Sequence, residues 1–131
     1  MALHDQLPIH RTGVRLLALA VRVQEQLPRS VKRLLGEKIM THCIDMLDLM
    51  ALANASQREA RAAYIQELLT KQRAVTVLLR VSHEARYLTA PALWAESMEV
   101  LGSIGSQAGG WLKSANAKAA KVMATNRAPA A

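Results

Sequence analysis

The chain has 131 residues, of which 51% are hydrophobic, and its formal net charge is +7 at neutral pH. This length suits one domain with a single core, and the excess of 17 lysines and arginines over 10 acidic residues directs attention to polyanionic partners. Leu, Ala, Val and Met supply the apolar content in place of aromatic residues, which favours helices over sheets. The single cysteine, Cys43, excludes an internal disulfide and fits a reducing compartment, which we expect to be the cytoplasm.

The first predicted helix covers residues 12–26, with Thr12 as its N-cap. Its longest apolar run, residues 16–21, is bounded by Arg15 and Arg22 and is too short for a membrane span, so no membrane partner is expected. Apolar residues nearly encircle this helix, and a helix that is hydrophobic on two faces usually buries both. We therefore expect the second face to meet another copy of the chain in an oligomer.

A break at residues 27–30, which include Pro28, separates the first helix from the second. Ser30 is the predicted N-cap of the second helix, which runs to about Asn54. Apolar residues in 34–53 recur with a period of about 3.5, which marks a long amphipathic helix with a wide buried face. Such a face requires the other segments to pack around it.

The third predicted helix begins with a capping box, in which Ser56 is the N-cap and Glu59 the third helical residue, and it runs to about Tyr87. The fourth begins near Pro91, because proline is tolerated in the first turn of a helix. Its apolar residues alternate at spacings of three and four up to Trp111.

The connections between these helices are only a few residues long, which forces sequential neighbours to run antiparallel. The sequence therefore predicts an all-α fold, an antiparallel up-down-up-down four-helix bundle, over residues 1–115. Residues 116–131 are rich in alanine and carry basic residues without acidic ones, and we predict a basic C-terminal tail there, either as a frayed extension of the fourth helix or as a disordered segment, with disorder favoured after Asn126.

Glycines form a stripe on the fourth helix at Gly102, Gly105 and Gly109. Each costs about 1 kcal/mol relative to alanine inside a helix, so one interpretation is close approach of another backbone, from a neighbouring helix or subunit. The other is that the helix ends at residues 109–110, since glycine is a common C-terminal stop. The two interpretations are compatible.

Motifs of catalysis and cofactor binding are absent: the sequence contains no HExxH, no CxxC, no phosphate-binding glycine loop and no nucleophile elbow. His42 and Cys43 are adjacent and point about 100° apart on a helix, so they cannot readily chelate one metal ion. A hydrogen-bonded core or interface role is favoured for His42. We predict neither an enzyme nor a protein with a cofactor or metal site, and the alternative is a bundle that holds a metal or cofactor through His42 and its neighbours.

Positive charge is arranged in groups. The first helix carries a line of arginines, a second line lies on the third helix, and a cluster sits at the turn into the second helix. These groups are Arg11, Arg15 and Arg22; Arg73 and Arg80; and Arg29, Lys32 and Arg33. Guanidinium groups in such lines can bind phosphates bidentately, which indicates nucleic-acid binding through the backbone. The alternative is that the arginines form salt bridges with Glu25, Glu84 or Glu96 and only solvate the surface.

Five segments carry a resemblance to a known family. They are LPRS at 27–30, LGEKI at 35–39, LANA at 52–55, LLRV at 78–81 and IGSQAGGWLK at 104–113. Together they resemble the accessory variability determinant (Avd) proteins of diversity-generating retroelements, within a wider group that includes four-helix proteins encoded by ribosomal intervening sequences. The match spans residues 8–115, and the Gly-Gly-Trp segment at 109–111 is its most specific part.

The resemblance implies a non-catalytic bundle that forms a ring-like homopentamer and binds the reverse transcriptase of the retroelement and its template RNA, with DNA or an RNA/DNA hybrid as a further partner. It would support mutagenic retrohoming, in which a template repeat is copied into a variable gene, and the polymerase activity would belong to the partner. The alternative is a structural or interaction bundle of the ribosomal intervening-sequence type without a retroelement role. The contact residues that we expect from the basic groups and the resemblance are Arg11, Arg15, Arg22, Arg29, Lys32, Arg33, Arg73, Arg80 and Lys113.

Overall fold

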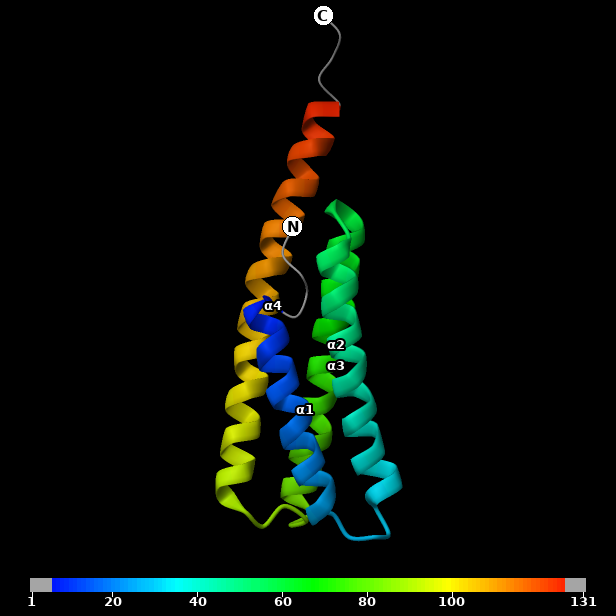
Figure 1. The fold of residues 1–131 in the computed structure, drawn as a ribbon, viewed down its shortest axis with the longest axis vertical. Coiled ribbons are helices and arrows are strands. Elements are labelled where there is room, and N and C mark those ends of the chain that lie inside the picture. The colour runs from blue at the N-terminus through cyan, green and yellow to red at the C-terminus, as the bar shows by residue number, and fades with distance from the viewer. Residues whose placement is uncertain (1–5, 127–131) are drawn as a thin grey trace, which may run out of the picture.

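The computed structural model describes residues 6–126, which form four α-helices. These are α1 (Pro8–Gln26), α2 (Glu37–Ala55), α3 (Arg58–Glu84) and α4 (Pro91–Asn126). Helices α1 and α3 each pack against both α2 and α4, so α1 and α3 occupy diagonal corners of a four-membered ring. Sequential helices run in opposite directions along a shared long axis (Figure 1). The predicted antiparallel four-helix bundle is therefore confirmed.

Helix α1 begins one turn earlier than the sequence pattern predicts. Leu7 is the N-cap and Pro8 occupies the first turn, where its fixed φ angle and its missing N–H are both tolerated. Thr12, the predicted N-cap, lies inside the helix, and its hydroxyl donates a 3.0 Å hydrogen bond to the carbonyl of Pro8. The prediction of an N-cap at Thr12 was wrong because a proline start competes with it. None of the helices in the described part of the chain is both long and apolar enough to cross a membrane.

A π-helical turn, Lys32–Gly36, precedes α2. Gly36 is buried beside the end of α1, where a Cβ atom would lie 2.8 Å from Cγ of Gln24. Only glycine permits this approach without displacing a neighbour, since real Cβ contacts are almost never that short. The close approach brings the start of the second helix against the end of the first.

The junction between α2 and α3 does not contain the predicted capping box. Gln57 is the N-cap of α3, without a side-chain cap hydrogen bond. Ser56 instead serves as the C-cap of α2, and its backbone N–H donates to the carbonyl of Ala53 at 3.2 Å. Because the connection is so short, Ser56 caps the C-terminus of α2 and is not available as the N-cap of α3. Arg58 then adopts φ 57°, in the left-handed region.

Helix α4 continues through residues 109–110 to Asn126. The predicted stop at the glycine pair was therefore wrong, because the alanines that follow have the highest helix propensity and offset the cost of two glycines. Residues 116–126 of the predicted tail belong to this helix, and residues 127–131 lie outside the described residues. A Cβ atom added at Gly102 or Gly109 would have no neighbour within 4 Å, so no other helix of the same chain approaches these glycines closely.

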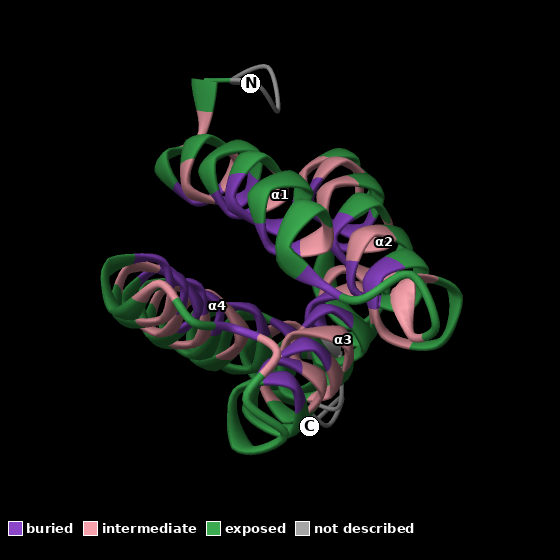
Figure 2. Ribbon diagram, turned by 90° about the horizontal axis from the view of Figure 1, so that it is seen from below, coloured by how far each residue is buried: buried purple, intermediate pink, exposed green. Residues whose placement is uncertain are grey.

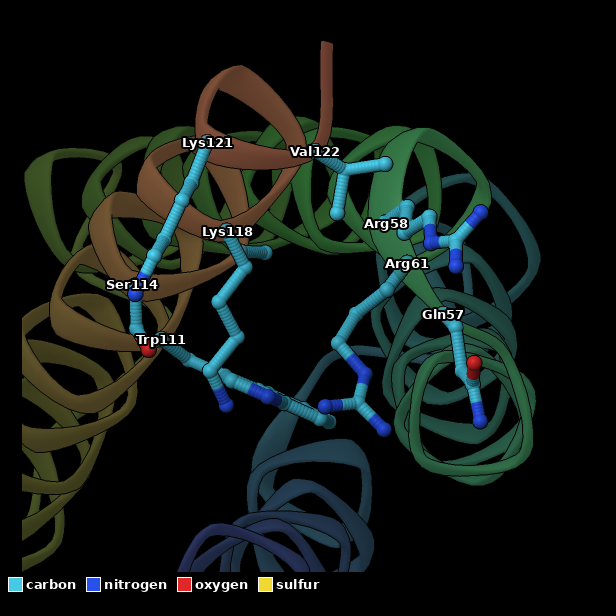
Figure 3. Close-up of a pocket in the computed structure, with 9 residues that line it drawn as sticks. Gln57, Arg58, Arg61, Trp111, Ser114, Lys118, Lys121 and Val122 are labelled. Carbon is cyan, nitrogen blue, oxygen red and sulfur yellow. The ribbon is translucent and has the colours of Figure 1, made fainter. Parts of the chain in front are cut away.

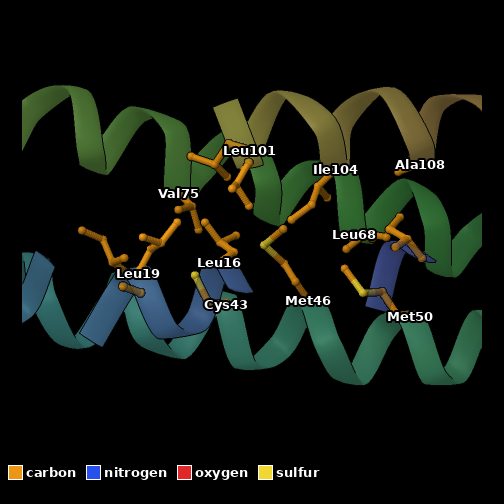
Figure 4. Close-up of a cluster of buried hydrophobic side chains, with 14 of the residues drawn as sticks. Leu16, Leu19, Cys43, Met46, Met50, Leu68, Val75, Leu101, Ile104 and Ala108 are labelled. Atoms are coloured by element: carbon orange, nitrogen blue, oxygen red, sulfur yellow. The ribbon is translucent and has the colours of Figure 1, made fainter. Parts of the chain in front are cut away.

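The core runs the length of the bundle, and buried residues face inward from all four helices (Figure 2). Leu16, Met46, Leu68 and Ile104 represent α1 to α4 in its central layer (Figure 4), and each is at most 2% exposed. The buried residues of α2 recur at spacings of three and four, as its amphipathic pattern predicted. They are Ile39, Cys43, Met46, Leu49, Met50 and Ala53.

An apolar strip remains on the outside, where α1 and α2 meet. Gly13 allows this contact to be close, because a Cβ atom there would lie 2.8 Å from Cδ2 of Leu47. Val14, Val21 and Ile44 stay 49%, 38% and 46% exposed along the strip. We call the strip the apolar seam; it consists of Val14, Leu17, Val21, Met40, Ile44 and Leu47, of which Leu17, Met40 and Leu47 are partly buried.

Candidate nucleic-acid interface

The two predicted contact arginines of α3 have no ion-pair partner among the described residues. Arg73 and Arg80 are exposed, and neither forms a hydrogen bond or an ion pair within residues 6–126. Their seven-residue spacing places them on the same side of α3, two turns apart. Val77 and Val81 lie between and beside them and are 58% and 47% exposed. Two free guanidinium groups therefore stand beside exposed apolar side chains on this helix.

The arginines of α1 are partly neutralised. The Nη2 atom of Arg15 donates a 2.7 Å hydrogen bond to Oε1 of Glu96 on α4. This bond, and then the charge of Glu96, raise the pKa of Arg15. An exposed pair of this kind contributes little to stability because water and salt screen it, so a phosphate can compete with the carboxylate. Arg11 and Arg22 are exposed and have no ion-pair partner among the described residues.

The remaining predicted contacts are spread over the surface. Arg29 and Arg33 are exposed at the connection between α1 and α2, and Lys32 there is partly buried. Lys113 is exposed on α4. Because α1 and α3 are diagonal in the ring, one copy of the chain does not gather its arginines into a single patch.

A basic cleft lies at the end of the bundle opposite the connection between α1 and α2. The sequence patterns described above do not predict it. Helix α1 has 19 residues and α4 has 36, which correspond to about 28 Å and 54 Å of helix. The end of α4 therefore extends past the start of α1, as Figure 1 shows. A cleft of about 440 Å³ lies between the end of α4 and the start of α3 (Figure 3). It is lined by Gln57, Arg58, Arg61, Trp111, Ser114, Ala115, Lys118, Lys121 and Val122.

Arg61 anchors one wall of this cleft. Its Nε atom donates to the carbonyl of Ala53 at 2.9 Å and its Nη2 atom to the carbonyl of Asn54 at 3.2 Å. It thereby satisfies carbonyl groups at the end of α2 that have no partner inside their own helix. The guanidinium carbon lies 5.9 Å from the ring centroid of Trp111, which is a cation–π distance. Trp111 is thus held in place at the base of the cleft.

A sequence signal for the cleft does exist. Arg58 and Arg61 are three residues apart, as are Lys118 and Lys121, so each pair shares one side of a helix. The predicted tail contains both lysines, and their inclusion in α4 brings them to the cleft that the two arginines also line.

His42 and Cys43 show no arrangement for chemistry. Within residues 6–126, no group of three His, Cys, Asp or Glu side chains is placed to hold a metal ion. Burial raises the pKa of the Cys43 thiol to about 12, which keeps it protonated and unreactive. The Nδ1 atom of His42 is buried without a hydrogen-bond partner, so the expected hydrogen bond at that atom is not formed.

This environment makes stability depend on pH. Burial lowers the pKa of His42 and the charge of Lys71 lowers it further, whereas Asp45 opposes the shift. The unfolded chain, with a His pKa of about 6.5, therefore binds a proton more readily than the folded one. The contribution of neutral His42 to the stability of the folded state is therefore complete above about pH 6.5. It is lost as the pH falls toward the lower pKa that His42 has in the folded protein.

We expect the melting temperature to fall between about pH 7 and pH 5, and to fall less in a His42→Gln variant that cannot titrate at this position. Thermal melts followed by circular dichroism at constant ionic strength measure both slopes. Equal slopes for the two proteins would show that His42 does not cause the pH dependence.

Comparisons with family models, with curated proteins and with solved structures find no match to this chain.

Proposed function

We propose that this protein is a non-catalytic, cytoplasmic nucleic-acid-binding subunit. The observation that carries the proposal is the pair of unpaired, exposed arginines on α3, in a chain with a net charge of +7. Guanidinium groups bind phosphate oxygens in a planar, bidentate geometry. Such contacts do not depend on the base sequence. The protein then recognises the shape and charge of a nucleic-acid backbone, through contacts of which Arg73 and Arg80 are the centre.

The resemblance to Avd proteins gives the proposal its biological setting. In that setting the protein binds the reverse transcriptase and the template RNA of a diversity-generating retroelement and supports mutagenic retrohoming. The partner carries out polymerisation, and this subunit positions the RNA or the enzyme. The nearby presence of a reverse transcriptase gene and an imperfect repeat pair tests the setting directly.

Filter binding of a structured RNA at several salt concentrations tests the central claim. For a complex dominated by phosphate contacts, the logarithm of the affinity falls by about 0.7 to 0.9 for each phosphate neutralised, per decade of salt. A linear fall whose slope corresponds to several neutralised phosphates supports the proposal. No binding at low salt, either by the protein alone or with its polymerase partner, would refute it.

The apolar seam supports self-association. A helix with a second exposed apolar face usually buries that face, and Val14 and Val21 are on such a face of α1. We propose that copies of the chain form a ring, and the resemblance implies a pentamer. Such a ring would cover the seam.

Ile44→Glu should break this association. Ile44 is 46% exposed in the single chain, so covering it is worth about half of the value for a whole isoleucine, on the order of 1 kcal/mol per copy, and a buried unpaired carboxylate adds a further cost. We expect the wild type to sediment as an oligomer and the variant as a monomer of unchanged helicity. Val77→Glu, at an exposed site on α3 away from the seam, is the matched control. An Ile44→Glu protein that sediments like the wild type would exclude the seam as the interface.

The same seam favours the second candidate function, a structural or interaction bundle of the ribosomal intervening-sequence type. Under that alternative the seam would bind a protein while the arginines only solvate the surface. Self-association without any salt-sensitive RNA binding would favour this alternative over the first.

A further inference from the structure

The cleft between α3 and α4 holds positive charge that the described residues do not neutralise. The side-chain cations of Arg58, Lys118 and Lys121 form no hydrogen bond or ion pair within residues 6–126, and no carboxylate lines the cleft. Cations gathered around one concave site repel one another unless a counter-charge enters it. The electrostatics therefore favour an anionic occupant.

The floor of the cleft is apolar and aromatic. Trp111, Ala115 and Val122 contribute this surface, and the side chains of Lys118 and Arg61 extend toward Trp111 from α4 and α3 (Figure 3). Trp111 is only partly buried, and it is one of the residues that line the cleft. A ligand that suits this site has both a negative group and a flat, weakly polar group.

We propose that the cleft binds one nucleotide of a single-stranded nucleic acid, with the base against Trp111 and the adjoining phosphates at Lys118 and Lys121. The volume of about 440 Å³ lies in the range of sites for ligands of nucleotide size. Aromatic stacking combined with a cationic groove is the general way in which proteins hold single strands. This inference rests on the proposed nucleic-acid function but assigns it a second site, separate from the arginines of α3.

A single strand fits better than the other polyanions. The bases of a duplex are stacked inside the helix and cannot reach Trp111, whereas unpaired bases can turn outward and stack on a side chain. An acidic peptide without aromatic residues, such as polyglutamate, would satisfy the lysines but offers no aromatic ring to the indole.

The backbone of Arg58 supports a role for this edge of the cleft. Its φ of 57° is in the left-handed region, which a non-glycine residue adopts at an energetic cost. Asparagine tolerates this conformation better than most residues, so Arg58→Asn removes the charge and keeps the backbone geometry.

The experiment uses the fluorescence of Trp111 in the full-length protein. The chain has two tryptophans, and Trp94→Phe leaves Trp111 as the only one. Trp94 stacks on His83 at 4.1 Å in another part of the bundle, and phenylalanine preserves a ring there. The probes are a short oligouridylate, the same length of RNA duplex, uridine monophosphate and a polyglutamate peptide.

We expect saturable quenching by the oligouridylate, and much weaker effects from the other three probes. Lys118→Glu combined with Lys121→Glu should weaken the affinity for the oligouridylate by about tenfold or more at low salt, and should lower the salt slope by about 1.4, at about 0.7 per phosphate of a single strand. Circular dichroism verifies that α4 stays helical. The neutral pair Lys118→Gln and Lys121→Gln should show about half the loss, and Arg58→Asn a smaller one.

Wild-type affinity in the Lys118→Glu, Lys121→Glu protein would overturn the proposal. So would equal quenching by the duplex, by uridine monophosphate or by polyglutamate, each of which would assign the cleft to a different ligand. The Arg73→Glu, Arg80→Glu protein, which carries the same change of charge, separates the two sites. If this variant binds structured RNA as well as the wild type does, the proposed function at Arg73 and Arg80 is refuted. The proposal for the cleft is still tested separately, by quenching of Trp111 with the oligouridylate.

Discussion

Replacing Arg73 and Arg80 together with glutamate is expected to abolish binding of structured RNA and to leave the helicity of the protein unchanged. Both side chains are exposed and unpaired, so no hydrogen bond or ion pair among the described residues is lost. Removal of two phosphate contacts lowers affinity by about a hundredfold at low salt, and the new carboxylates repel the backbone in addition. Mobility shifts across a salt series measure the effect.

Three further variants show what the arginines contribute. Arg73→Lys with Arg80→Lys keeps the charge but loses the planar, bidentate geometry, so its affinity should fall between that of the wild type and that of the glutamate variant. Lys38→Glu makes the same change of charge per site as Arg80→Glu, at an exposed position of α2 outside the predicted contacts. An equal loss of affinity in Lys38→Glu and Arg80→Glu would mean that net charge alone governs binding. Loss of helicity in the double glutamate variant would make the two arginines structural.

Leu68→Ala is expected to lower the free energy of unfolding by about 2–5 kcal/mol. Leu68 is fully buried in α3, in the central layer of the core, and the neighbouring helices cannot collapse fully onto the space that its truncation leaves. For a chain of this length the melting temperature should fall by on the order of 10 °C. Urea unfolding, fitted with a common slope, measures the change.

Leu52→Ala provides the matched control, because Leu52 is 45% exposed on α2. The same chemical change should there cost less than about 0.5 kcal/mol, since the side chain fills no enclosed space and alanine favours the helix. A similar loss at both positions would contradict the packing of this bundle, or would show that a second copy covers Leu52. Repeating the measurement at several protein concentrations separates these two causes.

The fold was largely predictable because its signals are local and mutually consistent. The apolar period of residues 34–53, the turn after Gln26 and the proline start of α4 each specify structure within a few residues. The errors fall where two elements compete for one residue. Ser56 caps the end of α2 instead of the start of α3. A capping motif predicted for each helix separately does not show that two helices compete for the same residue.

The candidate site was predictable only in part, for a different reason. Spacing along one helix identified Arg73 and Arg80, since residues seven apart share a side. Whether an arginine is already neutralised depends on the helix beside it, and the pairing of Arg15 with Glu96 joins residues far apart in the sequence. The basic cleft depends on the difference in length between α1 and α4, which appears only when the helices are placed together.

The unequal lengths of α1 and α4 give the bundle a polarity. One end has two closed connections and the other has the projecting end of α4. In a ring built by rotation about a single axis that runs along the bundles, every copy stands at the same height, so all the projecting ends would emerge on one rim. Such a ring has two chemically unlike rims, and a strand that threads or circles it would meet lysines from only one direction.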